Sequence, residues 1–219
     1  MRIALYEGNR IILQSNEDAF FDDVWLRDVY YPYLPSHQDV VFDVGAHYGF
    51  FTLKVAKKVK KVIAIEPDPY NFCFLLKNIG YNNLSNVECF NCALGDENRD
   101  VYLKRRYGYG RTQIVENKTS VRVKMKTLDA FVKEVGLPPS MLKVDVEGFE
   151  MKVLEGGRST LDLFNPKILF AAYHYPEEWK VIVKYLQGLG YKCLVYHVPL
   201  VLQRIKETYV YAISTSNIF

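Results

Sequence analysis

The sequence predicts an α/β protein built on a Rossmann-like, mostly parallel sheet with helices on both faces. Three observations support this fold class. An apolar strand at 39–45 runs through a turn with Gly45 and Gly49 into a helix, the order found where a parallel sheet binds a nucleotide. Apolar strand-like runs then alternate with helical patterns to about residue 189, as in βαβ units. The last two apolar runs are too close together for a crossover helix, so we expect them to pair antiparallel at the sheet edge.

The chain before the first sheet strand is interpreted as an accessory lead-in over residues 1–36. Two short apolar runs, 3–6 and 11–13, flank Glu7-Gly8-Asn9 and predict a hairpin. An amphipathic segment follows at about 19–31 and ends where prolines begin.

The remaining elements follow in order, each bounded by turn residues. The expected strands lie at 39–45, 62–65, 86–93, 141–146, 168–173, 193–198 and 209–214. The expected helices lie at 50–58, 68–78, 127–136, 149–163 and 177–189. Residues 97–126 interrupt this alternation with short strands at 100–106, 112–116 and 121–126, which predict an insertion of β-hairpin character. We treat residues 1–219 as a single domain.

Composition limits the class of protein. Of 219 residues, 49% are hydrophobic and 24% charged, and the formal net charge is +3; this is ordinary for a globular protein and does not demand a polyanionic partner. No apolar run approaches the roughly 20 residues of a membrane span, and no signal-peptide pattern opens the chain, so we expect a cytoplasmic protein. Cys89 and Cys92 form a Cys-x-x-Cys, but their odd separation on a strand points the side chains to opposite faces. We expect buried free thiols there.

The turn at 43–49 indicates the class of ligand. Its glycines have the spacing Gly-x-x-x-Gly and not the Gly-x-Gly-x-x-Gly of dinucleotide dehydrogenases. This spacing favours S-adenosylmethionine over NAD. His47, inside the turn, is expected to orient the loop and not to react.

Two further positions extend a pocket for an adenosine ligand. Glu66 stands 21 residues beyond Gly45 at a strand end, where a carboxylate accepts hydrogen bonds from both ribose hydroxyls. Its alternative role is that of a helix N-cap or of a carboxylate that complements the helix macrodipole. Asn91 and Ala93 end the next strand and offer an amide for the edge of adenine and space for its ring. A turn that binds no ligand is the alternative there.

Three ionisable side chains gather at the end of the strand 141–146. Alternation places Lys143, Asp145 and Glu147 on one face, and such groups are costly to bury unless they are paired. Neighbouring ionisable groups shift one another's pKa, as they do in catalytic sites. The other interpretation is a Lys–Asp pair that only holds the loop.

Together these motifs resemble the FkbM family of S-adenosylmethionine-dependent methyltransferases. The resemblance runs from about Asp28 to His174. It rests on Asp43-Val44-Gly45-Ala46-x-x-Gly49, Glu66-Pro67, Asn91-x-Ala93-Leu94-Gly95-Asp96, Thr127-Leu128-Asp129 and Lys143-Val144-Asp145-Val146-Glu147-Gly148-x-Glu150. It implies a class I methyltransferase fold, whose seven-stranded sheet has an antiparallel last strand. It also implies methylation of hydroxyl oxygens, commonly on sugars or polyketides.

The resemblance implies a role for each motif. The residues implied to bind the cofactor, from its methionine to its adenine end, are Asp43, Gly45, Ala46, Gly49, Glu66, Asn91 and Ala93. Lys143, Asp145 and Glu147 would lie where the methyl group is delivered, with Asp145 also in contact with the cofactor. Many family members carry an acidic residue near the end of the next strand. Here 171–176 reads Ala-Ala-Tyr-His-Tyr-Pro, which makes His174 a candidate substitute.

Methylation of a hydroxyl requires an acceptor oxygen held in line and a base for its proton. His174 and Asp145 are the candidate bases, and Lys143 is expected to stabilise the developing alkoxide. A strand-end histidine bonded to the backbone is the alternative for His174. Asp145, Glu147 and His174 together offer ligands for a divalent metal, but three ligands are too few to predict a metal site.

The insertion carries the candidate acceptor-binding residues Arg105, Tyr107, Tyr109 and Arg111. Arginines interleaved with tyrosines and glycines suit a lid over a sugar, phosphate or nucleotide acceptor. They suit RNA equally, because both side chains stack on bases, and a solvated hairpin tip is the third interpretation. We expect a methyltransferase that acts on a small-molecule or glycan hydroxyl. A tRNA methyltransferase and a non-catalytic cofactor-binding module are the alternatives.

Overall fold

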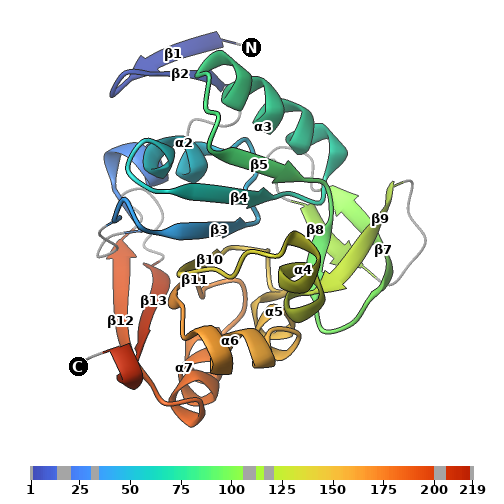
Figure 1. Ribbon diagram of the computed structural model, residues 1–219, viewed down its shortest axis with the longest axis vertical. Coiled ribbons are helices and arrows are strands. Elements are labelled where there is room, and N and C mark those ends of the chain that lie inside the picture. Colours follow the sequence, from blue (N-terminus) through green and yellow to red (C-terminus); the bar gives the residue numbers. More distant parts are fainter. Residues whose placement is uncertain are drawn as a thin grey trace.

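The structure, a computed structural model, describes residues 2–13, 21–30, 35–105, 112–115, 121–199 and 206–217. A central sheet lies between two layers of helices, and a smaller sheet stands beside it (Figure 1). A two-stranded hairpin near the N-terminus lies against helix α3.

Seven strands form the central sheet in the order β12-β13-β11-β10-β3-β4-β5. Their bounds are Val40–Val44 (β3), Lys61–Ile65 (β4), Val87–Phe90 (β5), Met141–Val144 (β10), Lys167–Ala171 (β11), Tyr191–Pro199 (β12) and Lys206–Ser214 (β13). The five strands from β11 to β5 are parallel, whereas β13, the last strand of the chain, pairs antiparallel with both β11 and β12. The predicted mostly parallel, seven-stranded sheet with an antiparallel last strand is confirmed.

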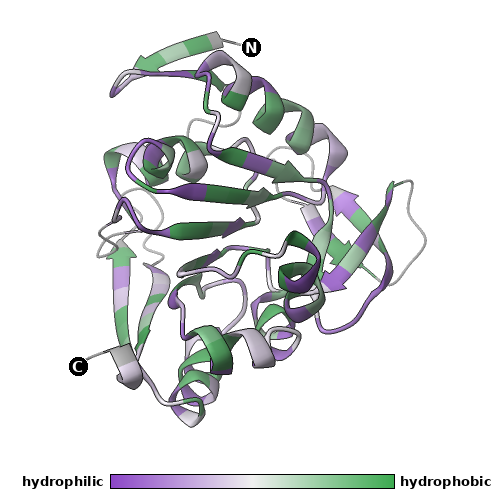
Figure 2. Ribbon diagram, in the orientation of Figure 1, coloured by the Kyte–Doolittle hydropathy of each residue, from purple (hydrophilic) through white to green (hydrophobic). Residues whose placement is uncertain are grey.

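The two faces of the central sheet are covered by different helices. One hydrophobic cluster contains side chains of Asp22–Leu26 (η1, a single wide helical turn), Phe50–Ala56 (α2) and Pro69–Tyr81 (α3). The other contains side chains of Leu128–Val135 (α4), Glu150–Glu155 (α5), Arg158–Phe164 (α6) and Glu178–Gly188 (α7). A short 3-10 helix, Thr215–Asn217 (η2), follows β13. Apolar residues dominate the sheet strands between these layers (Figure 2), and alternation along β3 sends Val41 to the first cluster and Phe42 to the second.

The smaller sheet has the strand order β6-β9-β7-β8. Its bounds are Ala93–Gly95 (β6), Arg99–Arg105 (β7), Thr112–Val115 (β8) and Val121–Thr127 (β9). The three strands expected between 100 and 126 are therefore present, with antiparallel pairing of β7 to β8 and to β9. The strand predicted at 86–93 is wrong in its extent, because β5 ends at Phe90 and the chain crosses to this second sheet. Asn91 fixes the crossing, since its side-chain amide donates to the carbonyl oxygens of Glu66 and Pro67 at 2.8 and 3.0 Å.

The single helix predicted at 149–163 is also wrong, because two consecutive glycines divide it into α5 and α6. A Cβ on Gly156 would lie 1.9 Å from the carbonyl oxygen of Gly95, and a Cβ on Gly157 would lie 2.6 Å from Leu128 Cδ2. The backbone here is packed so closely against β6 and α4 that only glycine fits.

The lead-in begins with the predicted hairpin, Arg2–Tyr6 (β1) and Asn9–Leu13 (β2). Side chains of α3 bind its backbone: Asn78 Oδ1 accepts from the amide of Ile12 at 2.7 Å, and Asn82 bonds both backbone groups of Arg10. Of the amphipathic segment expected at 19–31, the structure describes 21–30, which contains η1.

Two expectations from composition can be compared with the described residues. Cys89 packs into the first hydrophobic cluster and Cys92 into the second, and both are free thiols. Burial raises the pKa of Cys89 to about 12 and that of Cys92 to about 11. Within the described ranges, no helix has both the length and the apolar character needed to span a membrane.

Candidate active site

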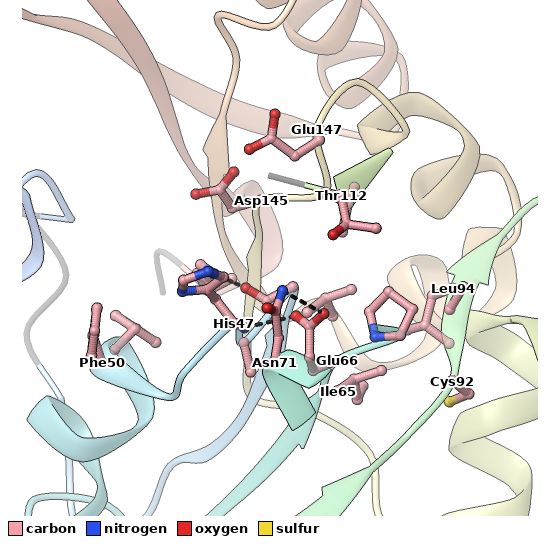
Figure 3. A pocket seen from close by; sticks show the side chains of 18 of the residues that line it. His47, Phe50, Ile65, Glu66, Asn71, Cys92, Leu94, Thr112, Asp145 and Glu147 are labelled. Atoms are coloured by element: carbon pink, nitrogen blue, oxygen red, sulfur yellow. Dashed lines mark hydrogen bonds between the residues drawn. The ribbon is translucent and has the colours of Figure 1, made fainter. Parts of the chain in front are cut away.

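A cavity opens at the carboxyl ends of β3, β4 and β10, where the small sheet meets the central one. The space between its lining residues, counted together with the open solvent at its mouth, is about 870 Å³. The lining residues come from the lead-in (Val24, Tyr30), the glycine turn and α2 (Val44, Gly45, Ala46, His47, Phe50, Phe51), the end of β4 and α3 (Ile65, Glu66, Pro67, Asn71), the small sheet (Cys92, Ala93, Leu94, Thr112, Ile114) and the end of β10 (Lys143, Asp145, Val146, Glu147). Asp145 and Glu147 lie on a different side of it from Cys92 and Leu94 (Figure 3).

The glycine turn is held against the ends of two neighbouring strands. The amides of Gly45 and Ala46 donate to the carbonyl oxygen of Ile65 at 2.9 and 3.0 Å. Gly45 has a φ of 78°, and a Cβ on it would lie 1.8 Å from the carbonyl oxygen of Asp145. Glycine is therefore required for both conformation and space. Gly49, the N-cap of α2, packs against Leu75 behind the turn and does not line the cavity.

A buried ion pair supports this turn from below. Lys143 Nζ lies 3.0 Å from Asp43 Oδ1 and donates to the carbonyl oxygen of Gly45 at 2.9 Å. Thr52 Oγ1 donates to the second oxygen of Asp43 at 2.6 Å. Asp43 is fully buried and does not line the cavity, whereas Lys143 does. The alternative considered for Lys143 from the sequence, a Lys–Asp pair that holds the loop, is therefore present, and the aspartate of that pair is Asp43.

Glu66 presents a fixed carboxylate to the cavity. Its oxygens accept from the amides of His47 at 2.8 Å and Asp68 at 2.9 Å, and from the side chain of Asn71 at 3.4 Å. Burial outweighs these bonds and raises the pKa of Glu66 to about 7. The N-cap of α3 is Asp68, whose side chain accepts from the amide of Tyr70. Glu66 is therefore not the N-cap of α3, which was one alternative role considered for it.

The expected adenine contacts divide between two locations. Ala93 is buried and lines the cavity beside Cys92 and Leu94. Asn91 is exposed and outside the cavity lining, and its amide is occupied by the two carbonyl groups at the end of β4. The structure therefore gives Asn91 an anchoring position and leaves the apolar wall to Ala93 and its neighbours.

Asp145 is the cavity-facing member of a charged cluster. Tyr30 donates its hydroxyl to Asp145 Oδ2 at 3.0 Å, and His174 Nε2 lies 3.5 Å from Oδ1. Burial alone raises the pKa of Asp145, but the neighbouring His174 and the charge of Lys143 outweigh it and hold that pKa well below its usual range. Asp145 is therefore a stable carboxylate, oriented by two neighbours.

His174 lies behind Asp145 and outside the cavity lining. Its Nδ1 faces two fully buried carboxylates, Glu150 Oε1 at 3.1 Å and Glu178 Oε2 at 3.4 Å. Burial lowers the pKa of His174, but the three carboxylates outweigh that effect and raise it well above its usual range. His174 is thus placed to act through Asp145 and not on a ligand directly.

Glu147 adds a second carboxylate to the cavity from a strained backbone. Its φ is 57°, in the left-handed region that residues other than glycine rarely adopt, and Gly148 follows at 99°. Such strain is retained mainly where a side chain must point in a set direction. Glu147 is not one of the three residues whose candidate ligand atoms lie within 4.8 Å of one another, which are Asp145, Glu150 and His174.

The predicted acceptor-binding loop can be followed only at its borders. Arg105 ends β7, while Tyr107, Tyr109 and Arg111 lie outside the described residues. At the other border, Thr112 and Ile114 of β8 line the cavity, and Thr112 Oγ1 donates to Asp68 Oδ2 at 2.7 Å. The insertion therefore covers the cavity next to the start of α3.

Sequence reasoning missed three residues of this site. In the sequence, Glu150 appears only as the last residue of a motif, Glu178 only as a residue of a predicted helix, and Tyr30 only as one of 17 tyrosines. The spacing of Glu178, four residues after His174, was the one available signal. The position of Tyr30 has no local signal, since it comes from the lead-in.

Comparisons with known sequences point to one family. Residues 43–193 match a family model described as the methyltransferase FkbM domain. A protein named methyltransferase 1, from Beauveria bassiana, is 30% identical over 53% of this chain and 57% of its own length. A tRNA(Phe) (4-demethylwyosine(37)-C(7)) aminocarboxypropyltransferase from Methanocaldococcus jannaschii is 39% identical over 33% of this chain and 28% of its own. The chain spans between half and about three fifths of the length of the curated relatives with the longest matches.

Solved structures give the same fold. A methyltransferase FkbM from Methylobacillus flagellatus superposes with a TM-score of 0.65 at 19% identity, over 87% of this chain and 47% of that one. An rRNA methylase from Streptococcus thermophilus superposes with a TM-score of 0.55 at 14% identity, over 93% and 98% of the two chains. These likenesses concern the fold alone.

Replacement of Gly45 by alanine is expected to destabilise the protein by about 2–4 kcal/mol, because strain at positive φ adds to a collision with the backbone of Asp145. Urea unfolding measures the effect. The matched control is Gly80→Ala in α3, where a Cβ meets nothing within 4 Å; this change is expected to leave stability unchanged or raise it. Equal stability of the two variants would contradict the assigned role of Gly45.

Proposed function

Because the chain belongs to the FkbM methyltransferase family, we propose that it transfers a methyl group from S-adenosylmethionine to a hydroxyl of a sugar, glycan or other small molecule. The observation that carries this proposal is the cavity at the strand ends, which has a glycine turn, the carboxylate of Glu66 and the carboxylate of Asp145 around it. The chain spans only part of its relatives, so acceptor and activity are proposed for this chain from its own residues.

The cavity fits the proposed cofactor in three respects. Glu66 offers a fixed carboxylate for ribose hydroxyls, and Ala93 leaves space beside apolar neighbours for a purine ring. Asp145 and Glu147 supply negative charge that suits a sulfonium cation. Gly45, Ala46, Glu66 and Ala93 would therefore hold the cofactor.

The proposed chemistry depends on Asp145. S-adenosylmethionine, when bound, supplies an electrophilic methyl group. Asp145 accepts a hydrogen bond from the acceptor hydroxyl and so directs an oxygen lone pair into the cavity. In the transfer, which would exchange the carbon–sulfur bond of the cofactor for an oxygen–carbon bond, Asp145 would take the hydroxyl proton. A carboxylate of low pKa suffices, because an alkylated oxygen that still carries its proton is far more acidic than an alcohol.

The lining favours an uncharged acceptor. Asp145 and Glu147 repel phosphate, and Lys143, the lysine among the described lining residues, is already bound to Asp43 and Gly45. The rings of Tyr30 and Phe51 lie next to it, 5.0 Å apart between centroids. Carboxylates beside aromatic rings suit a polyhydroxylated ring, which offers hydroxyl donors and C–H faces. Lys143 is thus proposed to position the turn and not to stabilise an alkoxide.

An RNA acceptor is the second candidate, favoured by the relatives and structural neighbours whose names refer to tRNA and rRNA. An RNA-binding protein is expected to lose tRNA affinity steeply as salt rises, whereas the proposed glycan enzyme binds tRNA weakly at any salt concentration. Titration of labelled tRNA at low and physiological salt separates the two. Tight, salt-sensitive binding coupled to methylation of the tRNA would replace the proposed acceptor.

Cofactor affinity is expected to depend on the ionisation of Glu66. The ribose hydroxyls donate to the carboxylate, so the affinity is highest above its pKa of about 7 and falls as the pH drops through that value, by up to about tenfold per unit. Without ligand, the folding stability changes with pH in the opposite direction. The pKa of Glu66 is raised in the folded protein, so its contribution to stability is fully present below the ordinary glutamate pKa and is lost as the pH rises through about 7.

Calorimetric titration with S-adenosylhomocysteine across this pH range measures the effect. Glu66→Gln is expected to bind more weakly and without the pH step. The control is Glu88→Gln, which removes an exposed carboxylate paired with Lys61 and should retain the wild-type profile. A flat wild-type profile would rule out the ribose contact.

Removal of the charge of Asp145 is expected to lower turnover by about 10²–10⁴-fold, the usual range for loss of a proton acceptor. S-adenosylhomocysteine formation in acceptor-containing extract fractions reports turnover, and calorimetry reports cofactor affinity. Asp145→Asn should change turnover far more than affinity. Asp96→Asn, which removes a carboxylate paired with Lys152 at 2.8 Å, is the control. Full turnover in Asp145→Asn would end the assignment.

A further inference from the structure

A buried cluster behind Asp145 contains more negative charge than the described side chains neutralise. His174 contacts three carboxylates, those of Asp145, Glu150 and Glu178, at 3.5, 3.1 and 3.4 Å. Glu150 and Glu178 are each fully buried. Lys143, whose charge acts on Asp145, is bound to Asp43 at 3.0 Å. Three carboxylates against one imidazolium leave an excess of negative charge where desolvation is most costly.

One carboxylate oxygen of each buried glutamate has no hydrogen-bond partner among the described residues. Glu150 Oε1 accepts from the amide of Val146, and Glu178 Oε2 accepts from the amide of His174. The second oxygens, Glu150 Oε2 and Glu178 Oε1, are buried and make no hydrogen bond there. The ring nitrogens of His174 lie close to carboxylate oxygens, yet neither forms a hydrogen bond of acceptable geometry. Such groups usually find a partner when buried.

The elements converge so that each supplies one group. Glu150 and Glu178 are the first residues of α5 and α7, and His174 lies between β11 and α7. These helices lie on the same face of the central sheet (Figure 1). Ligand atoms of Glu150, His174 and Asp145 fall within 4.8 Å of one another. One imidazole gives one nitrogen to an ion, and Nδ1 is the nitrogen that faces two carboxylates.

We propose that Glu150, Glu178 and Nδ1 of His174 bind a divalent first-row transition-metal ion of the Mn²⁺ or Zn²⁺ type. Two carboxylate oxygens and an imidazole nitrogen are ligands typical of these ions, and the imidazole favours them over Mg²⁺ and Ca²⁺. The ion takes the place of the Nδ1 proton and neutralises the buried glutamates.

Asp145 has a defined place in this arrangement. A histidine that binds a metal usually donates its other ring N–H to a carboxylate, which fixes the orientation of the ring. His174 Nε2 faces Asp145 Oδ1 at 3.5 Å, so the ion would orient Asp145 through the imidazole. Glu150, Glu178 and the ion are therefore positioning groups, and Asp145 is the group that meets the acceptor. The metal site itself stands independently of the methyl acceptor proposed above.

Metal binding is tested on the full chain after treatment with a chelator and transfer to metal-free buffer. Titration with Mn²⁺ followed by electron paramagnetic resonance, and elemental analysis after Zn²⁺ loading, are expected to give about one ion per chain and a rise in Tm. Pulsed resonance of the Mn²⁺ form should show coupling to an imidazole ¹⁴N. Failure of the chelated wild type to bind either ion, with an unchanged Tm, overturns the proposal in favour of protons shared between the glutamates.

Variants distinguish this site from adventitious binding. Glu178→Gln is expected to weaken ion binding by at least about tenfold. The matched control is Glu177→Gln, an adjacent and exposed carboxylate paired with Lys180, which should bind like the wild type. Wild-type affinity in Glu178→Gln would contradict the ligand set. If that variant does not fold, the wild-type stoichiometry and the ¹⁴N coupling decide the question, and neither readout requires methyl transfer.

Discussion

Asp43 and Lys143 lie side by side on the neighbouring parallel strands β3 and β10, buried from solvent with 3.0 Å between their charged atoms. The same lysine bonds the carbonyl oxygen of Gly45, and the same aspartate accepts from Thr52 of α2. Loss of one member of a buried pair leaves an uncompensated charge and costs roughly 3–5 kcal/mol. This pair therefore fixes the glycine turn relative to the strand that ends in Asp145.

Around this pair the strand ends concentrate carboxylates. Glu66 and Asp145 reach the cavity from β4 and β10, each held by hydrogen-bond donors that set its direction. The donors differ, and so do the outcomes: burial dominates at Glu66 and raises its pKa, whereas His174 and Lys143 dominate at Asp145 and lower it. One carboxylate thus titrates near neutral pH and the other stays ionised, which suits a binding role for the first and a chemical role for the second.

The insertion and the lead-in complete the cavity from opposite directions. The insertion contributes Thr112 and Ile114, and the lead-in contributes Val24 and Tyr30. Asn78 and Asn82 bind the hairpin of the lead-in, and Tyr30 at the other end of the lead-in donates its hydroxyl to Asp145. Segments added to the sheet therefore supply part of the lining of the cavity.

Local sequence determined the elements and the motifs. Apolar alternation identified the strands. Thr127 begins α4 because its side chain caps the helix, and Gly136 ends it because glycine readily adopts the left-handed conformation. The spacing of Gly45, Glu66 and Asp145 located one edge of the sheet. These features depend on neighbours within a few residues, which a sequence displays directly.

Tertiary structure decided which of these residues face the cavity. Asn91 carries the amide expected at a ligand, yet it bonds the end of β4 because β5 stops early. Lys143 pairs with Asp43, because parallel register sets the two residues opposite each other. Glu150 joins His174 only when α5 packs beside α7. Pairings between residues distant in the chain depend on register and packing, and no local pattern encodes them.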